Sequence, residues 1–277
     1  MEIEKIDLII KAALKEDMPE GDITSESIIP SEKESEAFIL AKEEGVLAGI
    51  EVAKRVFELI NPEVTFKKNL EDGQAFGKGE TLAQIRGHSI SLLKGERTSL
   101  NFIQRLSGIA TATRKFVQVV AGTKTKILDT RKTTPGLRIL EKYAVRMGGG
   151  TNHRFNLSEM VLIKDNHLKI AGNIPQAVRK AKENVKEGVR IEVEVTDLAE
   201  VKEAVQSGAD MIMLDNMKME EIKEAVEWVK GRVQLEVSGK VDLRNVKEIA
   251  SLGVDFISIG SLTHSYRSLD MSMEFSS

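Results

Sequence analysis

The sequence predicts an α/β protein built on a parallel sheet, and two patterns support this. From Lys126 onward, short runs rich in Val, Ile, Leu and Met alternate with amphipathic segments. Such runs are typical of parallel strands that are buried on both faces and joined by helices. Residues 35–87 show a different pattern, in which short alternating strands surround one helix. We therefore expect a smaller α/β region followed by a parallel sheet wrapped into a (β/α) barrel.

The composition excludes several classes of protein. The chain has 277 residues, no cysteine and a formal net charge of −3. Without cysteine there are no disulfides, thiolate nucleophiles or Cys-based zinc sites, and the net charge gives no general attraction to nucleic acid. The acidic, amphipathic N-terminus is unlike a signal peptide, and no apolar run approaches the ~20 residues of a membrane span. We expect a cytoplasmic protein with neither nucleic-acid nor membrane partners.

The elements of the first region follow from their periodicity. Residues 6–17 and 49–61 have apolar residues at helical spacing, and residues 35–45, 64–73 and 80–87 read as strands closed by turns. Residues 91–120 are predicted to form a long helical region, broken near Gly108. Within it, Arg105 could cap or bridge helices, and Arg97 follows Glu96 where a helix could project it outward into a partner's site. From the spacing alone, a surface ion pair is the favoured role for both arginines.

The second region repeats a strand, a loop and a helix about six times. Six units fall short of the eight in a complete (β/α) barrel, so we expect closure that is irregular or incomplete. The expected strands are 126–130, 160–164, 190–195, 211–215, 233–237 and 256–260. The expected helices include 174–185, 198–208, 219–231 and 243–253.

Two cationic pairs mark residues 129–156 as a candidate anion site. Arg131 and Lys132 follow an expected strand, and His153 and Arg154 follow three consecutive glycines. A helix-like segment separates the pairs. Guanidinium groups match carboxylates and phosphates bidentately, so this arrangement suits a small substrate with several negative charges.

Nearly all of the remaining expected strands also end in a charged residue or a Gly/Ser pair. The carboxyl ends of parallel barrel strands converge on the active site, so these residues are expected to meet. Carboxylates suit sugar hydroxyls, Mg²⁺ with its waters, or a developing cation, while backbone N–H groups of successive loops can cradle a phosphate. Glu192 can be a purely structural member of its Glu-x-Glu pair. The strand-end residues are Lys164, Glu192, Glu194, Asp215, Ser238, Gly239, Gly260 and Ser261.

The chemistry of this set is limited before any family is considered. It lacks a Ser/His/Asp triad, and the four histidines do not form a metal cluster. His153 and His167 could serve as acid/base groups, whereas His88 and His264 are expected to be structural or surface residues. A phosphorylated sugar together with a small anionic acid is the substrate class that the residues favour.

Several motifs, in order along nearly the whole chain, resemble the quinolinate phosphoribosyltransferase family. They are GERTSLNFIQRLSGIATAT, DTRKTTPGLRILEKYAVRMGGGTNHR, LIKDNH, EVEV, MLDN, EVSG and DFISIGSLTHS. The resemblance implies an N-terminal α/β sandwich-like domain, an irregular α/β barrel, and a homodimer with shared active sites. The domains would be residues 1–107, joined by the tail 265–277, and residues 108–264.

The resemblance also implies a reaction and roles for individual residues. Quinolinate and phosphoribosyl pyrophosphate would give nicotinate mononucleotide, pyrophosphate and CO₂, with Mg²⁺, in NAD biosynthesis. Relatives often carry Gly or Asn where this chain has Lys240. The quinolinate carboxylates would be held by Arg131, Lys132, His153 and Arg154, with Thr130 beside them and Arg97 donated across the dimer interface. Lys164 would lie between the substrates, Glu194 and Asp215 would face the ribose and its metal, and Ser238, Gly239, Ser258 and Gly260 would bind the 5′-phosphate. Lys132, Lys164, Glu194 and Asp215 would be catalytic.

Two other functions are alternatives to this activity, the first a paralogue in the same superfamily and the second a protein of a different class. A paralogue associated with molybdate transport would keep the fold and phosphoribosyl site but take another acid; the complete set of cationic residues argues against it. A non-catalytic sensor of a phosphorylated ligand would explain the cations and the phosphate cradle, yet it has no need of the two strand-end carboxylates Glu194 and Asp215.

Overall fold

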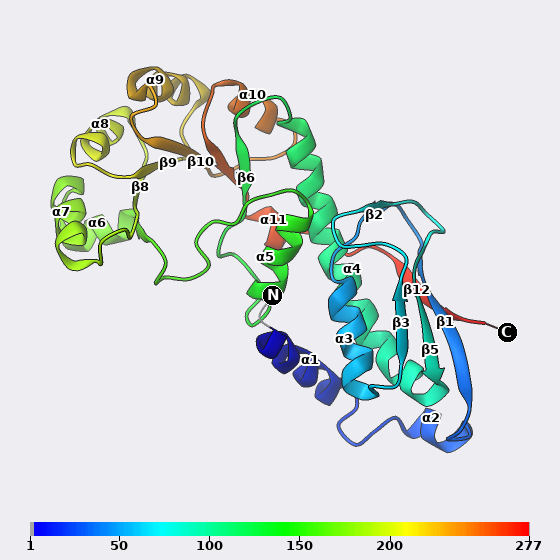
Figure 1. Ribbon diagram of the computed structural model, residues 1–277. Helices are drawn as coiled ribbons and strands as arrows, with labels where there is room; N and C mark the ends of the chain where they lie inside the picture. The colour runs from blue at the N-terminus through cyan, green and yellow to red at the C-terminus, as the bar shows by residue number, and fades with distance from the viewer. Residues whose placement is uncertain (1–2, 277) are drawn as a thin grey trace. The chain divides into compact units, whose positions relative to one another are not determined.

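The computed structural model describes residues 3–276, which form two compact units. One unit contains the chain up to Arg114, residues 133–149 and the segment from Leu262 onward, and the other contains residues 115–132 and 150–261 (Figure 1). The helices of the first unit are α1 (Ile3–Asp17), α2 (Ile23–Ile28), α3 (Ile50–Ile60), the greater part of α4 (Ser89–Val119), α5 (Arg138–Met147) and most of α11 (Ser261–His264). No helix of residues 3–276 is both long enough and apolar enough to span a membrane.

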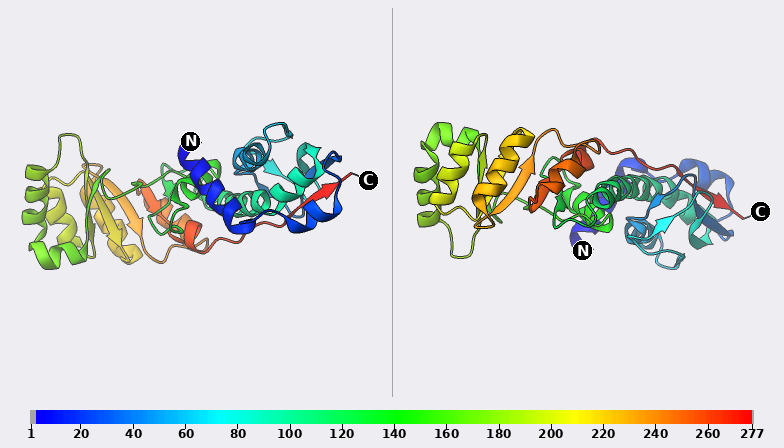
Figure 2. Two further views of the ribbon diagram at one scale, coloured as in Figure 1. Left: turned by 90° about the horizontal axis from the view of Figure 1, so that it is seen from below. Right: turned by 90° about the horizontal axis from the view of Figure 1, so that it is seen from above.

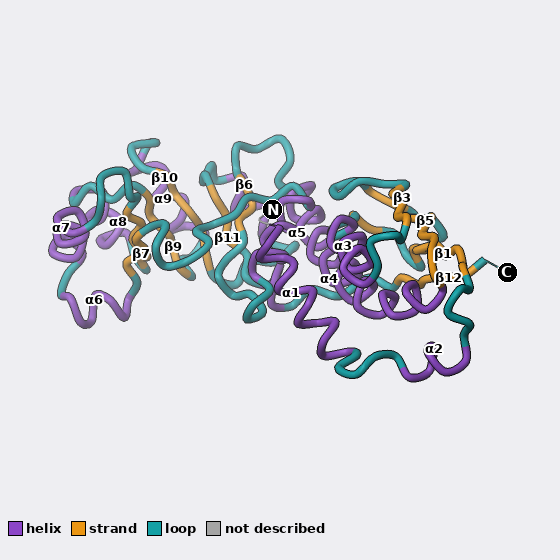
Figure 3. The backbone as a smooth tube through the Cα atoms, turned by 60° about the horizontal axis from the view of Figure 1, so that its bottom comes forward, coloured by secondary structure: helices purple, strands orange, loops and turns teal. Residues whose placement is uncertain are grey.

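The first unit contains an antiparallel sheet of four strands, ordered β12-β1-β5-β3. Figure 3 shows β12, from the C-terminal end of the chain, beside β1. Alternate residues of β1, including Ile39, are buried in a core that α3 and α4 complete with Phe57 and Leu100. The strands are β1 (Glu34–Ala41), β3 (Thr65–Lys68), β5 (Thr81–His88) and β12 (Met271–Phe275), and a separate pair is formed by β2 (Gly45–Val46) and β4 (Ala75–Phe76).

Helix α4 is continuous, so the predicted break near Gly108 is wrong. The glycine serves close packing instead, because a Cβ atom built on Gly108 would lie 2.2 Å from the backbone carbonyl oxygen of Arg267. One glycine inside a long helix costs only about 1 kcal/mol, which the packing of the helix can offset. Three residues earlier, Arg105 forms a 2.5 Å ion pair with the fully buried Glu141 and thus bridges α4 to α5, one of the roles considered for it in place of a surface ion pair.

The second unit contains a parallel sheet of six strands, ordered β6-β11-β10-β9-β8-β7. Helices α7, α8 and α9 lie side by side along one face of this sheet (Figures 1 and 2). The strands are β6 (Lys126–Leu128), β7 (Val161–Ile163), β8 (Ile191–Val195), β9 (Met211–Asp215), β10 (Gln234–Ser238) and β11 (Phe256–Ser258). The helices are α6 (Asp165–Ala171), α7 (Ile174–Asn184), α8 (Leu198–Gln206), α9 (Met219–Val229) and α10 (Val246–Ser251).

The sheet curves but does not close, as its number of strands predicts. Strands β6 and β7 are its two edges, and within residues 3–276 no ladder joins them. Thr151 extends the β6 edge by one isolated parallel bridge to Leu128. Residues of the loops that follow β6 and residues at the strand ends line the same cavity.

Candidate active site

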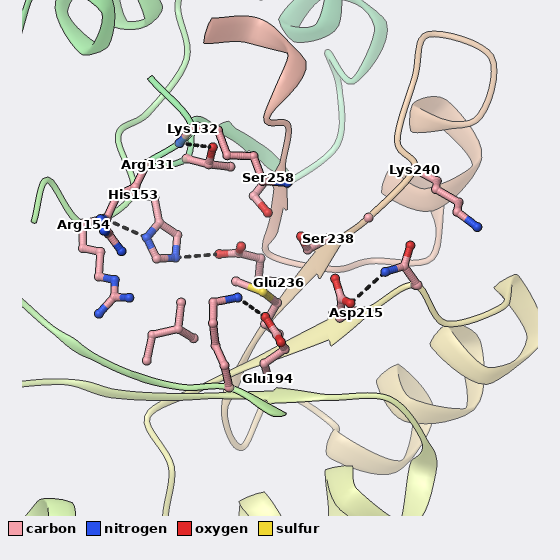
Figure 4. Close-up of a pocket in the computed structure, with 16 residues that line it drawn as sticks. Arg131, Lys132, His153, Arg154, Glu194, Asp215, Glu236, Ser238, Lys240 and Ser258 are labelled. Carbon is pink, nitrogen blue, oxygen red and sulfur yellow. Dashed lines mark hydrogen bonds and ion pairs between the residues drawn. The ribbon is translucent and has the colours of Figure 1, made fainter. Parts of the chain in front are cut away.

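A cavity of about 650 Å³ lies at the carboxyl ends of the strands of the second unit (Figure 4). Its lining comes from the loops after β6, from β7 to β11, and from the loops that follow β9 and β10. The lining residues are Thr130, Arg131, Lys132, His153, Arg154, Leu162, Lys164, Glu194, Met213, Asp215, Asn216, Glu236, Ser238, Gly239, Lys240 and Ser258.

One end of the cavity is cationic, as the sequence predicts. Arg131 and Lys132 turn into it after Thr130, whose hydroxyl accepts a 3.0 Å hydrogen bond from the Lys132 backbone N–H. Arg154 approaches from the second loop. Burial and the neighbouring Arg131 lower the pKa of the Arg154 guanidinium, because both disfavour its positive charge. The two guanidiniums thus form a concentrated positive field that a polyanionic ligand would relieve.

A buried carboxylate fixes the loop that carries this second cationic pair. Asp129 is fully buried and accepts a 2.9 Å hydrogen bond from the backbone N–H of His153. It also accepts a hydrogen bond from the side-chain amide of Asn152. A carboxylate that receives N–H donors inside a protein forms stronger bonds than a neutral acceptor. Asp129, which directly follows β6, therefore fixes the loop that carries His153 and Arg154.

Lys164 lies between the two ends of the cavity. It follows β7, its ammonium group forms an ion pair with Glu194 of β8, and its side chain remains 42% exposed. A lysine at this point can reach a ligand on either side. His167 is outside the cavity: its Nδ1 accepts a 2.9 Å hydrogen bond from the Lys164 backbone N–H, and its exposed ring completes the start of α6.

The other end of the cavity is built from four adjacent strands. The parallel register pairs Ser238 of β10 with Asp215 of β9, and Glu194 of β8 with Met213 of β9. Ser258 ends β11 at the same edge. The predicted strand-end residues therefore meet because equal positions on parallel neighbours share an edge.

Two loops with left-handed backbone close this end. Gly239 has φ +90°, and Asn216 and Lys240 have φ near +50°. A Cβ atom on Gly239 would lie 2.3 Å from the amide oxygen of Asn216, so glycine is required for the close approach. Asn216 also donates a 2.7 Å hydrogen bond to Asp215 and thereby orients that carboxylate. Lys240 adopts a backbone conformation that Gly or Asn adopts more easily.

A buried cluster of His153, Glu192 and Glu236 forms the floor between the two ends. Both glutamates are fully buried, and their carboxylate oxygens lie 3.0 Å and 3.4 Å from Nε2 of His153. Burial and the neighbouring Glu192 raise the pKa of the Glu236 carboxyl well above its usual range, because two buried carboxylates cannot both be charged at low cost. These three residues are also close enough to suggest a metal site. However, Nδ1 of His153 accepts a hydrogen bond from the Arg154 backbone N–H, which assigns the ring proton to Nε2, so the cluster is held by a proton.

The structure adds cavity residues that sequence reasoning did not select. Glu236 and Asn216 line the site, and Glu192, first read as purely structural, lies against His153. The available signal for Glu236 was a charged residue between the two apolar residues Leu235 and Val237 of a strand. Gly260 follows β11 but is not among the lining residues within 3–276. Arg97 belongs to the first unit, where it is exposed on α4.

The fold and the site together define an α/β protein with an open barrel-like sheet and a pocket suited to a polyanionic small molecule. Residues 22–107 match the family described as "Quinolinate phosphoribosyl transferase, N-terminal domain", and residues 109–274 match its C-terminal domain. The chain therefore belongs to the quinolinate phosphoribosyl transferase family.

Individual relatives agree with this assignment. The "Probable nicotinate-nucleotide pyrophosphorylase [carboxylating]" of Bacillus subtilis is 45% identical over 259 residues, which cover 94% of this chain and 89% of the relative. The crystal structure of NadC from Streptococcus pyogenes has a TM-score of 0.96 at 43% identity and covers 100% of this chain and 98% of its own. The nicotinate-nucleotide pyrophosphorylase structure from Francisella tularensis has the same TM-score at 40% identity, with 100% and 98% coverage.

Proposed function

We propose that this chain transfers the phosphoribosyl group of phosphoribosyl pyrophosphate to quinolinate, with loss of CO₂, to give nicotinate mononucleotide and pyrophosphate. The reaction would serve de novo NAD biosynthesis, in the cytoplasm. The observation that carries this proposal is the two-ended cavity, with Arg131, Lys132 and Arg154 at one end and two carboxylates with a glycine loop at the other. The family to which the chain belongs supports the same reaction.

The cationic end would bind the acid. Quinolinate carries two neighbouring carboxylates, and two guanidiniums and an ammonium can pair with both at once. Lys164, placed beside Glu194, would contact the acid and the ribose part of the second substrate. Holding both substrates in one orientation makes the attack of the pyridine nitrogen on C1 of the ribose effectively unimolecular.

The carboxylate end would bind the phosphoribosyl group. Ser238, Gly239 and Ser258 would hold the 5′-phosphate. As the bond from C1 to pyrophosphate breaks, positive charge develops on the ribose ring, and the carboxylates of Glu194 and Asp215 would stabilise it. The same two carboxylates suit Mg²⁺, which prefers oxygen ligands and keeps several waters. Bound there, the ion would neutralise charge on the leaving pyrophosphate.

Decarboxylation would follow from the product of the transfer. Once the ring nitrogen carries the ribose, the ring is a pyridinium and can accept the electron pair left at C2 when the bond to the carboxylate breaks. A proton then replaces the carboxylate at C2, so atoms and charge balance. The site residues would serve this step by keeping the ring fixed at its remaining carboxylate.

A second subunit would complete each site. Arg97 is exposed on α4 and is matched by resemblance to a position that the family contributes across a dimer interface. We propose a homodimer in which each Arg97 binds the acid in the partner's cavity. The exposed position supports a role outside the first unit's own core.

One assay tests the proposal against its rivals. Purified protein is incubated with quinolinate, phosphoribosyl pyrophosphate and Mg²⁺, and CO₂ and nicotinate mononucleotide are measured. Both products are expected in equal amounts. Product from nicotinate but not from quinolinate would indicate a related transferase with another acid, and tight binding of both ligands without product would indicate a sensor.

A further inference from the structure

Both ring nitrogens of His153 face groups of the protein. Nδ1 accepts a 2.8 Å hydrogen bond from the backbone N–H of Arg154, and Nε2 lies 3.0 Å from a carboxylate oxygen of Glu192. A backbone N–H can only donate, so Nδ1 must present its lone pair. The imidazole is therefore neutral, its proton is on Nε2, and that N–H donates to Glu192.

This arrangement forms a histidine bridge, defined here as Glu192, the His153 ring and the backbone N–H of Arg154. The bridge links strand β8 to the loop that carries a cation of the pocket. Asp129 holds the same loop by accepting the His153 backbone N–H at 2.9 Å. Two buried carboxylates, Glu192 of β8 and Asp129 directly after β6, thus fix one short segment at its side chain and at its main chain.

Arg154 needs such support. Its guanidinium lies near Arg131, and each charge disfavours the other. Its Nη1 donates to the backbone carbonyl of Met160 at 2.8 Å, which sets one end of the side chain. The histidine bridge holds the backbone of Arg154 and so fixes the position from which its side chain extends. The buried charge of Glu192 also favours the cation electrostatically.

We propose that Glu192 is a positioning residue for the acid substrate, acting through the histidine bridge on Arg154. In this role His153 is an internal connector, and its ring nitrogens do not bind the substrate carboxylate. The inference rests on the proposed function, since quinolinate is the acid in question. It separates the two glutamates of β8: Glu194 faces the ribose, and Glu192 prepares the site for the acid.

Two substitutions test whether the hydrogen bond of the bridge matters. Glu192→Met keeps the length of the side chain but removes the acceptor, whereas Glu192→Gln keeps an oxygen that can accept from Nε2–H. We expect Glu192→Met to raise KM for quinolinate about ten- to hundredfold, by analogy with the loss of a group that orients a metal-binding histidine. KM for phosphoribosyl pyrophosphate should stay within about twofold, because Asp215 and Gly239 are not touched by the bridge. Glu192→Gln should restore most of the affinity for quinolinate.

The imidazole itself gives a direct readout. The chain has four histidines, so ¹⁵N chemical shifts of the ring nitrogens can be assigned by comparison with a His153→Gln variant. Wild-type protein and Glu192→Gln should show the Nε2–H tautomer at His153 with Nε2–H hydrogen-bonded. In Glu192→Met the ring loses its partner at Nε2, so we expect it to move away from the Arg154 N–H and to lose the single-tautomer signal. A purely structural role of Glu192 would not change the tautomer.

A matched control and the outcomes complete the test. Val193→Ala removes buried volume from the opposite side of the same strand and should leave KM for quinolinate unchanged. If wild-type protein forms product but Glu192→Met keeps its KM and its tautomer, the inference is wrong. An equal effect of both Glu192 substitutions would also overturn it, because charge would then matter and the hydrogen bond would not. If wild-type protein forms no product, the proposed function fails, and the tautomer measurement still judges the bridge.

Discussion

At the scale of single residues, the cationic side chains of the site lie next to buried acidic residues. Asp129 and Glu192 contact His153, which precedes Arg154. Arg131 and Arg154 disfavour each other's charge, and the buried carboxylate of Glu192 partly offsets this at Arg154 before any ligand binds. Glu192 and Glu236 belong to strands, Asp129 directly follows one, and the cations belong to loops that Asp129 and Glu192 hold in place. This division lets the pocket keep its shape before a dianionic substrate arrives.

The first residue-scale prediction concerns Arg131. Arg131→Ala should lower kcat/KM for quinolinate by the equivalent of about 2–5 kcal/mol, as when one partner of a close charge pair is removed. Steady-state kinetics with each substrate varied in turn measure the loss. Arg179→Ala serves as the matched control, because Arg179 is an exposed arginine on α7 with only a 3.9 Å ion pair to Glu183. Unchanged kinetics for Arg131→Ala would remove this residue from the site.

A pH dependence follows from Glu236. Its carboxyl pKa is raised above the ordinary 4.5 in the folded protein by burial and by Glu192. Below pH 4.5 the folded and unfolded states both hold the proton, so no difference arises. As the pH rises further, the unfolded chain ionises first, and the free energy of unfolding falls until the folded pKa is passed.

Glu236→Gln removes this titration and keeps the shape of the side chain. Denaturant unfolding from pH 4.5 to neutrality should show a shallower decline of stability with pH for the variant than for wild-type protein. Parallel curves for the two proteins would mean that Glu236 is ionised in the fold.

The residues that could be predicted from the sequence are those whose place depends on topology alone. Asp215 and Ser238 end parallel strands, and any parallel sheet brings such ends to one edge. The role of Glu236 could not be predicted, because its contact with His153, at 3.4 Å, joins residues 83 positions apart in the chain. Whether a charge inside a strand is stabilised is decided by such distant partners.

At the scale of elements, helix α4 shows how tertiary packing overrides a local signal. Its glycine predicts a break when read alone, yet the helix continues because the chain near Arg267 packs against the missing side chain. Gly108 does mark a special position in the helix, but its role depends on Arg267, which lies more than half the chain length away. A single sequence contains no information on that contact until the fold is known.

The same contact gives an element-scale prediction. Gly108→Ala should destabilise the protein by about 1–3 kcal/mol, despite the better helix propensity of alanine, because the new methyl group collides with a backbone carbonyl. Chemical denaturation measures the change. Gly77→Ala is the control, since a Cβ atom there meets nothing within 4 Å. A Gly108→Ala protein as stable as the wild type would show that the tail does not approach α4 closely.

At the scale of the whole molecule, the proposed dimer makes a quantitative prediction. Arg97→Ala and Asp215→Ala should each be nearly inactive, one through the donated residue and one through the cavity. When equal amounts are unfolded together and refolded, about half of the dimers are mixed, and each mixed dimer has one intact site. Activity should therefore return to about a quarter of the wild-type value. No recovery would mean that Arg97 serves its own chain or no site at all.

The pairing of β12 with β1 has a consequence for synthesis on the ribosome. Strand β1 emerges early, yet the partner for one of its edges is made from the last residues of the chain. At usual translation speeds, roughly ten to fifty seconds pass between the synthesis of β1 and that of β12. During this interval the N–H and C=O groups on that edge of β1 have no strand partner. Unpaired edges invite pairing with other chains. The nascent protein is therefore most vulnerable to aggregation while still attached, and chaperones that shield it during this interval should affect its yield more than any that act after release.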